Sequence, residues 1–306
     1  MAACLSPGWA EGCARFAHPV FDPVRSALAQ LAREHDWPDH RRLNALAAGA
    51  APRTASGLPV RFVAPGAAGA NYELRVHASG EVATRERNWH DLFNALAWLA
   101  FPLSKAKLNA IHASEIKRET RGRGPARDLL TIFDEGGALV ACSDPYLIEL
   151  IRGFRWQTLF WKERARVRAG MRILVFGHAV LEKALEPWPG ITCKALLLAV
   201  EPALLGAPIA QLRAPLDAAA AGWFEACARG GSPRDLAPLP IFGYPGWSGE
   251  SEHPEFYADV RYFRPSPHPD SASGEYNRAG SRPGSRCRPL RRQAEESPGS
   301  AERDAG

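Results

Sequence analysis

Three short stretches of the sequence combine histidine with acidic or amide side chains. In RERNWHDLFN, residues 85–94, His90 precedes Asp91 and lies four residues before Asn94. Residues four apart share a helix face, so His90 and Asn94 are expected to point the same way. A first helical turn disfavours a charged imidazole, which suits His90 to metal ligation or general-base catalysis. The alternative is a histidine that makes only structural hydrogen bonds.

The second stretch, KAKLNAIHASEI, follows Phe101-Pro102. Lys105, Asn109 and His112 are spaced by four and three residues and so fall on one helix face. A tight joint at the proline would fold this helix back against the preceding one. The two helices would then bring two histidines and two asparagines to one pocket: His90, Asn94, Asn109 and His112.

The third stretch is FGHAVLEKAL, residues 176–185, in which Gly177 ends an apolar run and His178 begins a helix. Backbone N–H groups at such strand-to-helix turns often contact ligands. His178 and Glu182 are four apart, a spacing that can ligate a metal or simply form a hydrogen-bonded pair. Both interpretations stay open.

These stretches support the hypothesis of a metal-dependent hydrolase. A divalent metal held by His90, His112 and His178 would activate water. The predicted catalytic side chains are His90, Asn94, Asn109 and Glu182. Asn88 and Asp91 have a sufficient structural explanation, as the N-cap of the helix and the carboxylate of a capping box.

An arginine-rich loop, ETRGRGPARD at residues 119–128, could hold the substrate. Arg121, Arg123 and Arg127 would bind a phosphate ester or another anionic group. The alternative is a solvated loop, and the Gly-Lys-Ser/Thr ending of a P-loop is missing. A competing hypothesis for the whole protein is a non-catalytic binding module for a small anionic ligand or a protein.

Composition narrows the partners and the location. The chain has 306 residues, 46% of them hydrophobic, and a net charge of +5. No apolar run reaches the roughly 18 residues that span a bilayer, and the first residues do not form a secretory signal. We therefore expect a cytoplasmic protein with no membrane partner. The small charge excess makes nucleic acid an unfavoured partner, and six scattered cysteines indicate no disulfide framework.

The elements that must position these residues form an α+β pattern. Helices are predicted at 21–37, from Asp39, from Asn88, from Ser104, from Pro145, at 178–188, at 191–200 and at 215–229. Strands are predicted at 59–65, 171–177 and 239–247, with hairpins at 72–85 and 129–142. The hairpins and the irregular alternation favour an α+β domain with a small mixed or antiparallel sheet over a doubly wound one.

The domain boundaries follow from composition. Residues 1–14 are expected to be loose, and residues 15–264 to form one domain. Residues 265–306 are rich in Pro, Ser, Gly and Arg, nearly lack large apolar side chains, and are expected to be disordered.

Five motifs together resemble a bacterial family known as domain of unknown function 3025. They are RERNWHDLFNALAWLAFP, KAKLNAIH, RGPARDLLTIFDEGGALV, FGHAVLEKAL and FGYPGW. The resemblance covers about residues 15–264. It implies a single domain with NWHD-x-FNAL and FGH-x3-EK as signatures, and it assigns no catalytic residue, cofactor or partner.

Overall fold

Four strands form a mixed sheet in the order β4-β3-β5-β6. Their bounds are β3 Gly137–Cys142, β4 Met171–Val175, β5 Thr192–Ala199 and β6 Ala237–Pro240. β3 runs parallel to β5, and the two edge strands are antiparallel to their neighbours. The whole of β3 is buried, as its continuous apolar sequence GALVAC requires. The structure is a computed structural model and describes residues 7–66, 71–118, 124–188 and 190–267.

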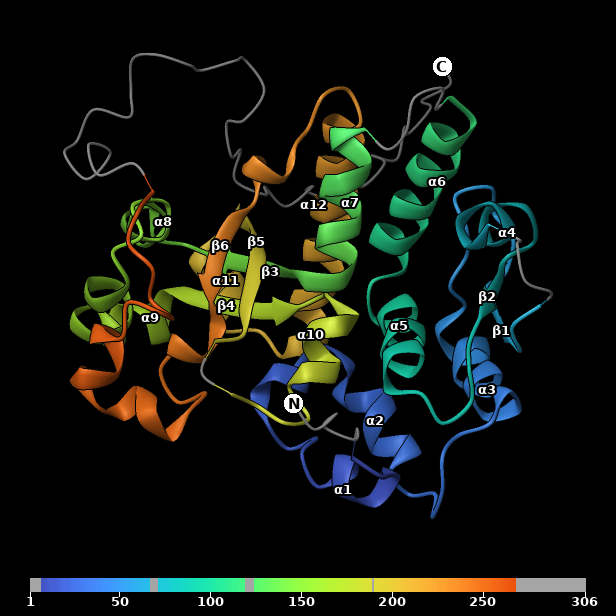
Figure 1. Ribbon diagram of the computed structural model, residues 1–306, viewed down its shortest axis with the longest axis horizontal. Coiled ribbons are helices and arrows are strands. Elements are labelled where there is room, and N and C mark those ends of the chain that lie inside the picture. The colour runs from blue at the N-terminus through green and yellow to red at the C-terminus, as the bar shows by residue number, and fades with distance from the viewer. Residues whose placement is uncertain (1–6, 67–70, 119–123, 189, 268–306) are drawn as a thin grey trace, which may run out of the picture.

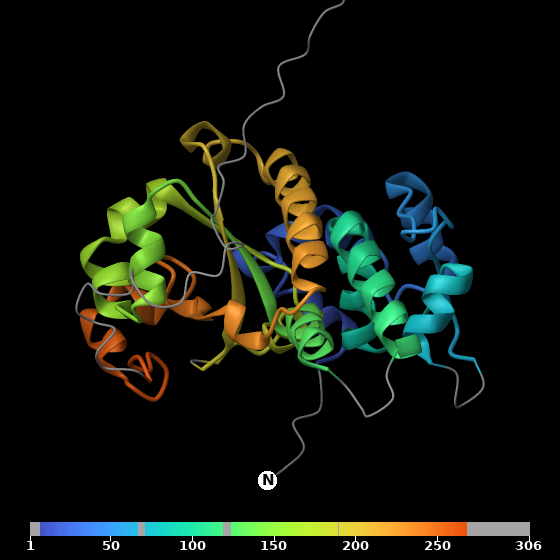
Figure 2. The same ribbon diagram turned by 90° about the horizontal axis from the view of Figure 1, so that it is seen from above.

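Helices pack on both faces of this sheet. On one face lie α7 Pro125–Gly136 and α12 Ile209–Cys227, and on the other lie α8 Pro145–Arg152 and α9 Arg164–Gly170. Figure 2 shows the sheet between these two groups. A π-helical turn, Thr158–Lys162, leads into α9, and the short α11, Pro202–Leu205, follows β5.

A second helical layer lies beside α7 and α12. It contains α4 Tyr72–Ser79, α5 Trp89–Ala100, α6 Pro102–Arg118 and α10 His178–Lys183. α5 packs against α10, and α6 packs against α4, α7 and α12, as Figure 1 shows. Because α10 begins directly after β4, the sheet and this helical layer meet at His178.

The N-terminal elements and two short strands complete the helical layer. They are α1 Trp9–Cys13, the 3-10 helix η1 Pro19–Val24, α2 Arg25–Leu31, α3 His40–Ala50, β1 Arg61–Val63 and β2 Glu81–Ala83. β1 and β2 pair in parallel. Trp9 is buried and stacks on Trp89 with 5.4 Å between ring centroids, so residues 9–13 are ordered rather than loose as expected.

The C-terminal part of the described chain is a series of 3-10 turns around β6. They are Pro233–Asp235, Ile241–Gly243, Gly249–Glu252 and Pro254–Ala258. The predicted α+β class is confirmed. Among the described residues, no helix has the length and apolar content to cross a membrane. The predicted tail lies outside the described residues from 268 onward.

Several local predictions are confirmed. Asp39 caps α3 by accepting a hydrogen bond from the backbone of Arg42, and Asn88 caps α5 by accepting one from the backbone of Asp91. The predicted strands at 59–65 and 171–177 contain β1 and β4. The Pro102 joint folds α6 back beside α5, as its sequence indicates.

Other local predictions are wrong. Both predicted hairpins, at 72–85 and 129–142, are a helix followed by a strand, since α4 precedes β2 and α7 precedes β3. The glycines that suggest turns, Gly80 and Gly136-Gly137, mark the ends of these helices instead. The predicted helix at 191–200 is β5, because a short apolar run does not distinguish a buried strand from a buried helix. Ser104 does not cap α6, which begins at Pro102; its hydroxyl donates to the backbone oxygen of Asp217.

Candidate active site

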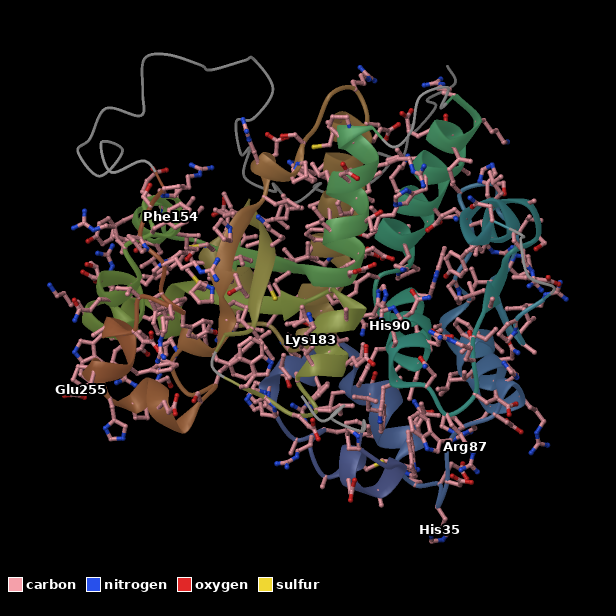
Figure 3. All side chains as sticks on the ribbon, viewed as in Figure 1. His35, Arg87, His90, Phe154, Lys183 and Glu255 are labelled. Carbon is pink, nitrogen blue, oxygen red and sulfur yellow. The ribbon has the colours of Figure 1, made fainter. Side chains whose placement is uncertain are left out.

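Polar side chains of five helices line one pocket of about 390 Å³. The helices are α4, α5, α6, α7 and α10, and α6 contributes His112. The groups that carry its chemistry are Tyr72, Glu73, His90, Asn94, Asp134 and His178. Figure 3 shows His90 on α5 beside the helix that carries Lys183, which is α10.

His90 and His178 contact each other directly in this pocket. Their Nε2 atoms are 3.0 Å apart, and Nδ1 of His90 lies 3.0 Å from a carboxylate oxygen of Glu182. The His90 side chain is about a third exposed, whereas His178 is buried. The hydrogen bond to Glu182 raises the pKa of His90, and burial lowers the pKa of His178 to about 4.

The donors and acceptors around the two rings determine where the protons of this pair lie. Two Nε2 atoms in contact need one hydrogen between them. If His90 is an imidazolium, it donates to both Glu182 and His178, and His178 directs Nδ1–H toward Asp134, whose carboxylate is 3.9 Å away. If His90 is neutral, His178 must donate, and its bare Nδ1 faces the same carboxylate. The charged form of His90 therefore has the better electrostatics, and the pair titrates as a unit.

The backbone before His178 fixes the position of its ring. Gly177 packs so closely on the end of α7 that an added Cβ would lie 2.4 Å from the backbone oxygen of Glu135. The N–H of Gly177 donates to the backbone oxygen of Gly137 at 2.9 Å. This contact joins the start of α10 to the end of α7 and brings His178 next to Asp134.

A buried lysine connects α5, α6 and α7. Nζ of Lys105 donates to Asp134 at 2.6 Å and to Asn94 at 2.8 Å, and Nδ2 of Asn94 lies 2.9 Å from the Tyr72 hydroxyl. Burial alone would raise the pKa of Asp134, but the charge and hydrogen bond of Lys105, together with the nearby histidines, outweigh it and hold that pKa below its ordinary value. Asp134 is therefore a stable carboxylate beside the histidine pair.

The pKa of Glu73 is shifted in the opposite direction from that of Asp134. Its Oε2 accepts a hydrogen bond of 2.6 Å from Nδ2 of Asn109, which also donates to the backbone oxygen of Glu73. Burial raises the pKa of Glu73 to about 7, and the nearby charge of Asp134 adds to the rise. Glu73 can therefore hold a proton near neutral pH, whereas Asp134 does not.

Asp91 has a structural role, although not the predicted one. Its carboxylate accepts hydrogen bonds from the backbone and the guanidinium of Arg85, not from the backbone of Asn88 as in a capping box. Burial opposes ionisation of Asp91, but these bonds outweigh it and lower its pKa. Asp91 fixes the segment before α5 on the pocket rim.

The predicted three-histidine metal site stays a prediction. His90, His112 and His178 all line the pocket. One nitrogen of His90 and one of His178 are adjacent. Within the described part of the chain, however, no three His, Cys, Asp or Glu side chains are arranged to hold a metal ion.

The predicted amide and arginine residues have different outcomes. Asn94 forms hydrogen bonds with Lys105 and Tyr72. Asn109 forms one with the carboxyl group of Glu73. Arg127 lies in α7, where its charge acts on Glu73, but it is not among the residues that line the pocket. Arg121 and Arg123 lie outside the described residues.

Three functional groups of the pocket are missing from the sequence-based prediction: Tyr72, Glu73 and Asp134. Lys105 is on the predicted helix face, but the prediction gave it no role. The wrong hairpin assignments placed Tyr72, Glu73 and Asp134 in strands or turns. One signal was available, because Asn71 precedes Tyr72-Glu73 as a helix N-cap and accepts hydrogen bonds from two backbone N–H groups of α4. A helix there would have put Glu73 in a first turn.

Comparison with known proteins gives a family and no activity. Neither a curated protein nor a solved structure matches the chain. A family model described as protein of unknown function (DUF3025) matches residues 60–267, which include all the pocket residues named above. With well over half of its length matched, the chain belongs to this family.

Proposed function

We propose that this protein is a hydrolase that acts on a small polar molecule by general acid–base catalysis. One observation carries the proposal: the pocket contains two pairs of titratable groups whose pKa values are moved in opposite directions. Glu73 and His90 have raised pKa values, and Asp134 and His178 have lowered ones. Opposed shifts of this kind are typical of sites that need an acid and a base at the same pH.

Glu73 is the proton donor in this proposal. A carboxylic acid with a pKa of about 7 still holds its proton near neutral pH and can pass it to a leaving group. Asn109 positions the carboxyl group through its hydrogen bond. Asp134 stays ionised beside Lys105 and keeps a negative field on Glu73, which favours the protonated form of the acid.

The His90–His178 pair is the proton acceptor. In its uncharged form the pair takes a proton from water as the water oxygen bonds to the electrophilic atom of the substrate. The bond to the leaving group breaks, and that group takes the proton of Glu73. Glu182 stabilises the imidazolium that forms on His90. Proton exchange with solvent then restores both groups, so no metal ion is required in any step.

The charge of the pocket points to the class of substrate. The described lining contributes four carboxyl groups, those of Glu73, Asp91, Asp134 and Glu135, and one guanidinium, that of Arg85. Glu73 holds a proton, and Asp91 and Asp134 are paired with Arg85 and Lys105, so Glu135 leaves the lining slightly negative, which does not favour a phosphate dianion. A neutral or cationic substrate is therefore favoured over the phosphate ester that the arginine-rich loop suggests.

The test is a hydrolysis screen with paired variants. Neutral chromogenic esters, amides and glycosides are compared with phosphate monoesters, using wild type, Glu73→Gln and His90→Gln. We expect turnover in a neutral class and a loss of roughly 10²-fold or more in each variant. Glu255→Gln, a remote exposed carboxyl change, should leave the rate unchanged.

Two results would contradict the proposal. The first is a compound that raises the melting temperature of the wild type, loses that effect in Glu73→Gln, and is never converted; this result would establish a binding module. The second is a rate that disappears on removal of metal by a chelator and returns with a divalent ion. Metal analysis of untagged protein accompanies the screen and tests the three-histidine prediction directly.

A further inference from the structure

A second pocket lies on the other side of α5 from the candidate active site. Its volume is about 280 Å³, and it is formed by η1, α2, α3, α5 and α12. At 100° per residue, Leu96 and Leu99 of α5 point away from His90 and Asn94. The two pockets therefore share a helix and no lining residue.

Leucines and alanines form the apolar part of this second pocket, Ser26 and Gln30 are polar, and there is a single charged group. Leu46, Leu96 and Leu99 provide the largest apolar side chains, and alanines fill the space between them. Arg213 is the one charged residue among those that line it. A pocket that combines an apolar side with one cation suits a ligand with an anionic head and an apolar tail.

The guanidinium of Arg213 has donors to spare. It is half-buried, and Nη1 donates to the backbone oxygen of Pro23 at 2.8 Å. Among the described residues, no carboxylate forms an ion pair with it. Asp217, one turn further along α12, is the acidic group that acts on it, but both Asp217 oxygens already accept the backbone N–H groups of Leu103 and Ser104.

We propose that this pocket binds a small carboxylic acid with a short apolar tail. The carboxylate takes the free N–H groups of Arg213, and the tail lies against Leu46, Leu96 and Leu99. The pocket volume of about 280 Å³ lies just below the usual range for drug-sized ligands, so the expected ligand is small, such as a six-carbon acid. A phosphate group is disfavoured because the lining offers a single cation.

The test is calorimetric titration of the full chain with hexanoate, compared with hexylamine and hexanol. We expect hexanoate to bind and hexylamine not to bind, since Arg213 repels a cation. Arg213→Met keeps an apolar stem but removes the charge, so hexanoate affinity should fall roughly tenfold or more while hexanol is unaffected.

A second variant fills the pocket without touching the arginine. Gly49 lines the pocket in α3, and an added Cβ there would meet nothing within 4 Å, so Gly49→Leu can extend a side chain into the open space. It should abolish hexanoate binding. Gly222→Leu is the matched control, because Gly222 is also helical with open space around it and lies outside the pocket.

Three outcomes would overturn the inference: no heat from millimolar hexanoate, equal binding of hexanoate and hexylamine, or unchanged hexanoate affinity in Arg213→Met. The test is independent of the proposed hydrolase. Glu73→Gln, which alters only the other pocket, should bind hexanoate as the wild type does.

Discussion

Nε2 of His90 and Nε2 of His178 lie 3.0 Å apart, and a carboxylate stands behind each ring. Glu182 contacts Nδ1 of His90, and Asp134 lies 3.9 Å from Nδ1 of His178. The order carboxylate–imidazole–imidazole–carboxylate leaves room for one proton between the rings. That proton lies between the rings in both states; when the pair is charged it belongs to His90, so the exposed ring carries the charge and the buried ring stays neutral.

Glu182→Gln should lower the pKa of His90. The wild-type carboxylate favours the imidazolium through its hydrogen bond and its charge, and the amide retains only the hydrogen bond. An NMR titration of the His90 ring protons measures the change. Glu255→Gln serves as the control, since Glu255 is exposed and distant in the structure (Figure 3). A His90 pKa that stays the same or rises in Glu182→Gln would show that Glu182 is not the partner.

Glu73→Gln should gain stability relative to wild type as the pH rises. The folded-state pKa of Glu73 is about 7, above the ordinary 4.5, so its protonated form stabilises the fold fully below pH 4.5. That contribution is lost as the pH rises toward 7. The variant has no such group, so its free energy of unfolding should rise by roughly 2 kcal/mol relative to wild type between pH 5.5 and pH 8.

Urea denaturation at these two pH values measures the difference. Because other titrating groups are common to both proteins, their effects cancel in the comparison. Asn109 can still donate to the side-chain oxygen of a glutamine, so the local hydrogen bond survives. An equal difference at both pH values would mean that Glu73 is ionised throughout, and would remove the proposed proton donor.

Lys105→Met should destabilise the protein by roughly 3 kcal/mol. Lys105 is 4% exposed, and its removal leaves the carboxylate of Asp134 without its cation in a buried position. Lys107→Met, two residues along the same helix, removes a surface pair with Glu225 and should cost less than about 1 kcal/mol. Denaturant unfolding compares the two.

The double variant Lys105→Met/Asp134→Asn separates the causes. If the unpaired carboxylate causes the loss, the added Asp134→Asn change should recover part of the stability. A double variant that is less stable than Lys105→Met alone would assign the loss to packing around Trp98, whose ring lies 5.6 Å from Nζ.

The sequence is informative about the site where its signals are local. The N-cap at Asn88, the proline joint after α5 and the i, i+4 spacings correctly bring His90, Asn94 and His112 to one pocket. These patterns act within one or two helical turns, and tertiary packing does not reverse them.

The predictions are wrong where one local sequence pattern is compatible with two different structures. The segment LLTIFDEGGALVAC has apolar runs on both sides of a glycine pair and reads equally as a hairpin or as a helix followed by a strand. The long-range parallel pairing of β3 with β5 selects the helix followed by a strand. Asp134 thereby moves from a solvated turn to the end of a helix, next to Lys105. No local pattern could reveal that contact.

Gly177→Ala should destabilise the protein by roughly 1–3 kcal/mol, because the new methyl group meets the backbone oxygen of Glu135 at 2.4 Å and the backbone must shift. Gly136→Ala is the matched control, since its Cβ would meet nothing within 4 Å. Thermal unfolding compares the two. If both variants melt together with the wild type, the contact between α7 and α10 is looser than the structure indicates.

The rate of the proposed hydrolysis should depend on pH as a bell with its maximum near neutrality. The alkaline side reports loss of the Glu73 proton around pH 7, and the acidic side reports protonation of the histidine pair. Glu182→Gln lowers the pKa of His90 and should therefore move only the acidic side, toward lower pH. In Glu73→Gln the residual rate should no longer fall as the pH rises above 7. If that fall persists in Glu73→Gln, another group supplies the proton, and the role of Glu73 in the mechanism is wrong.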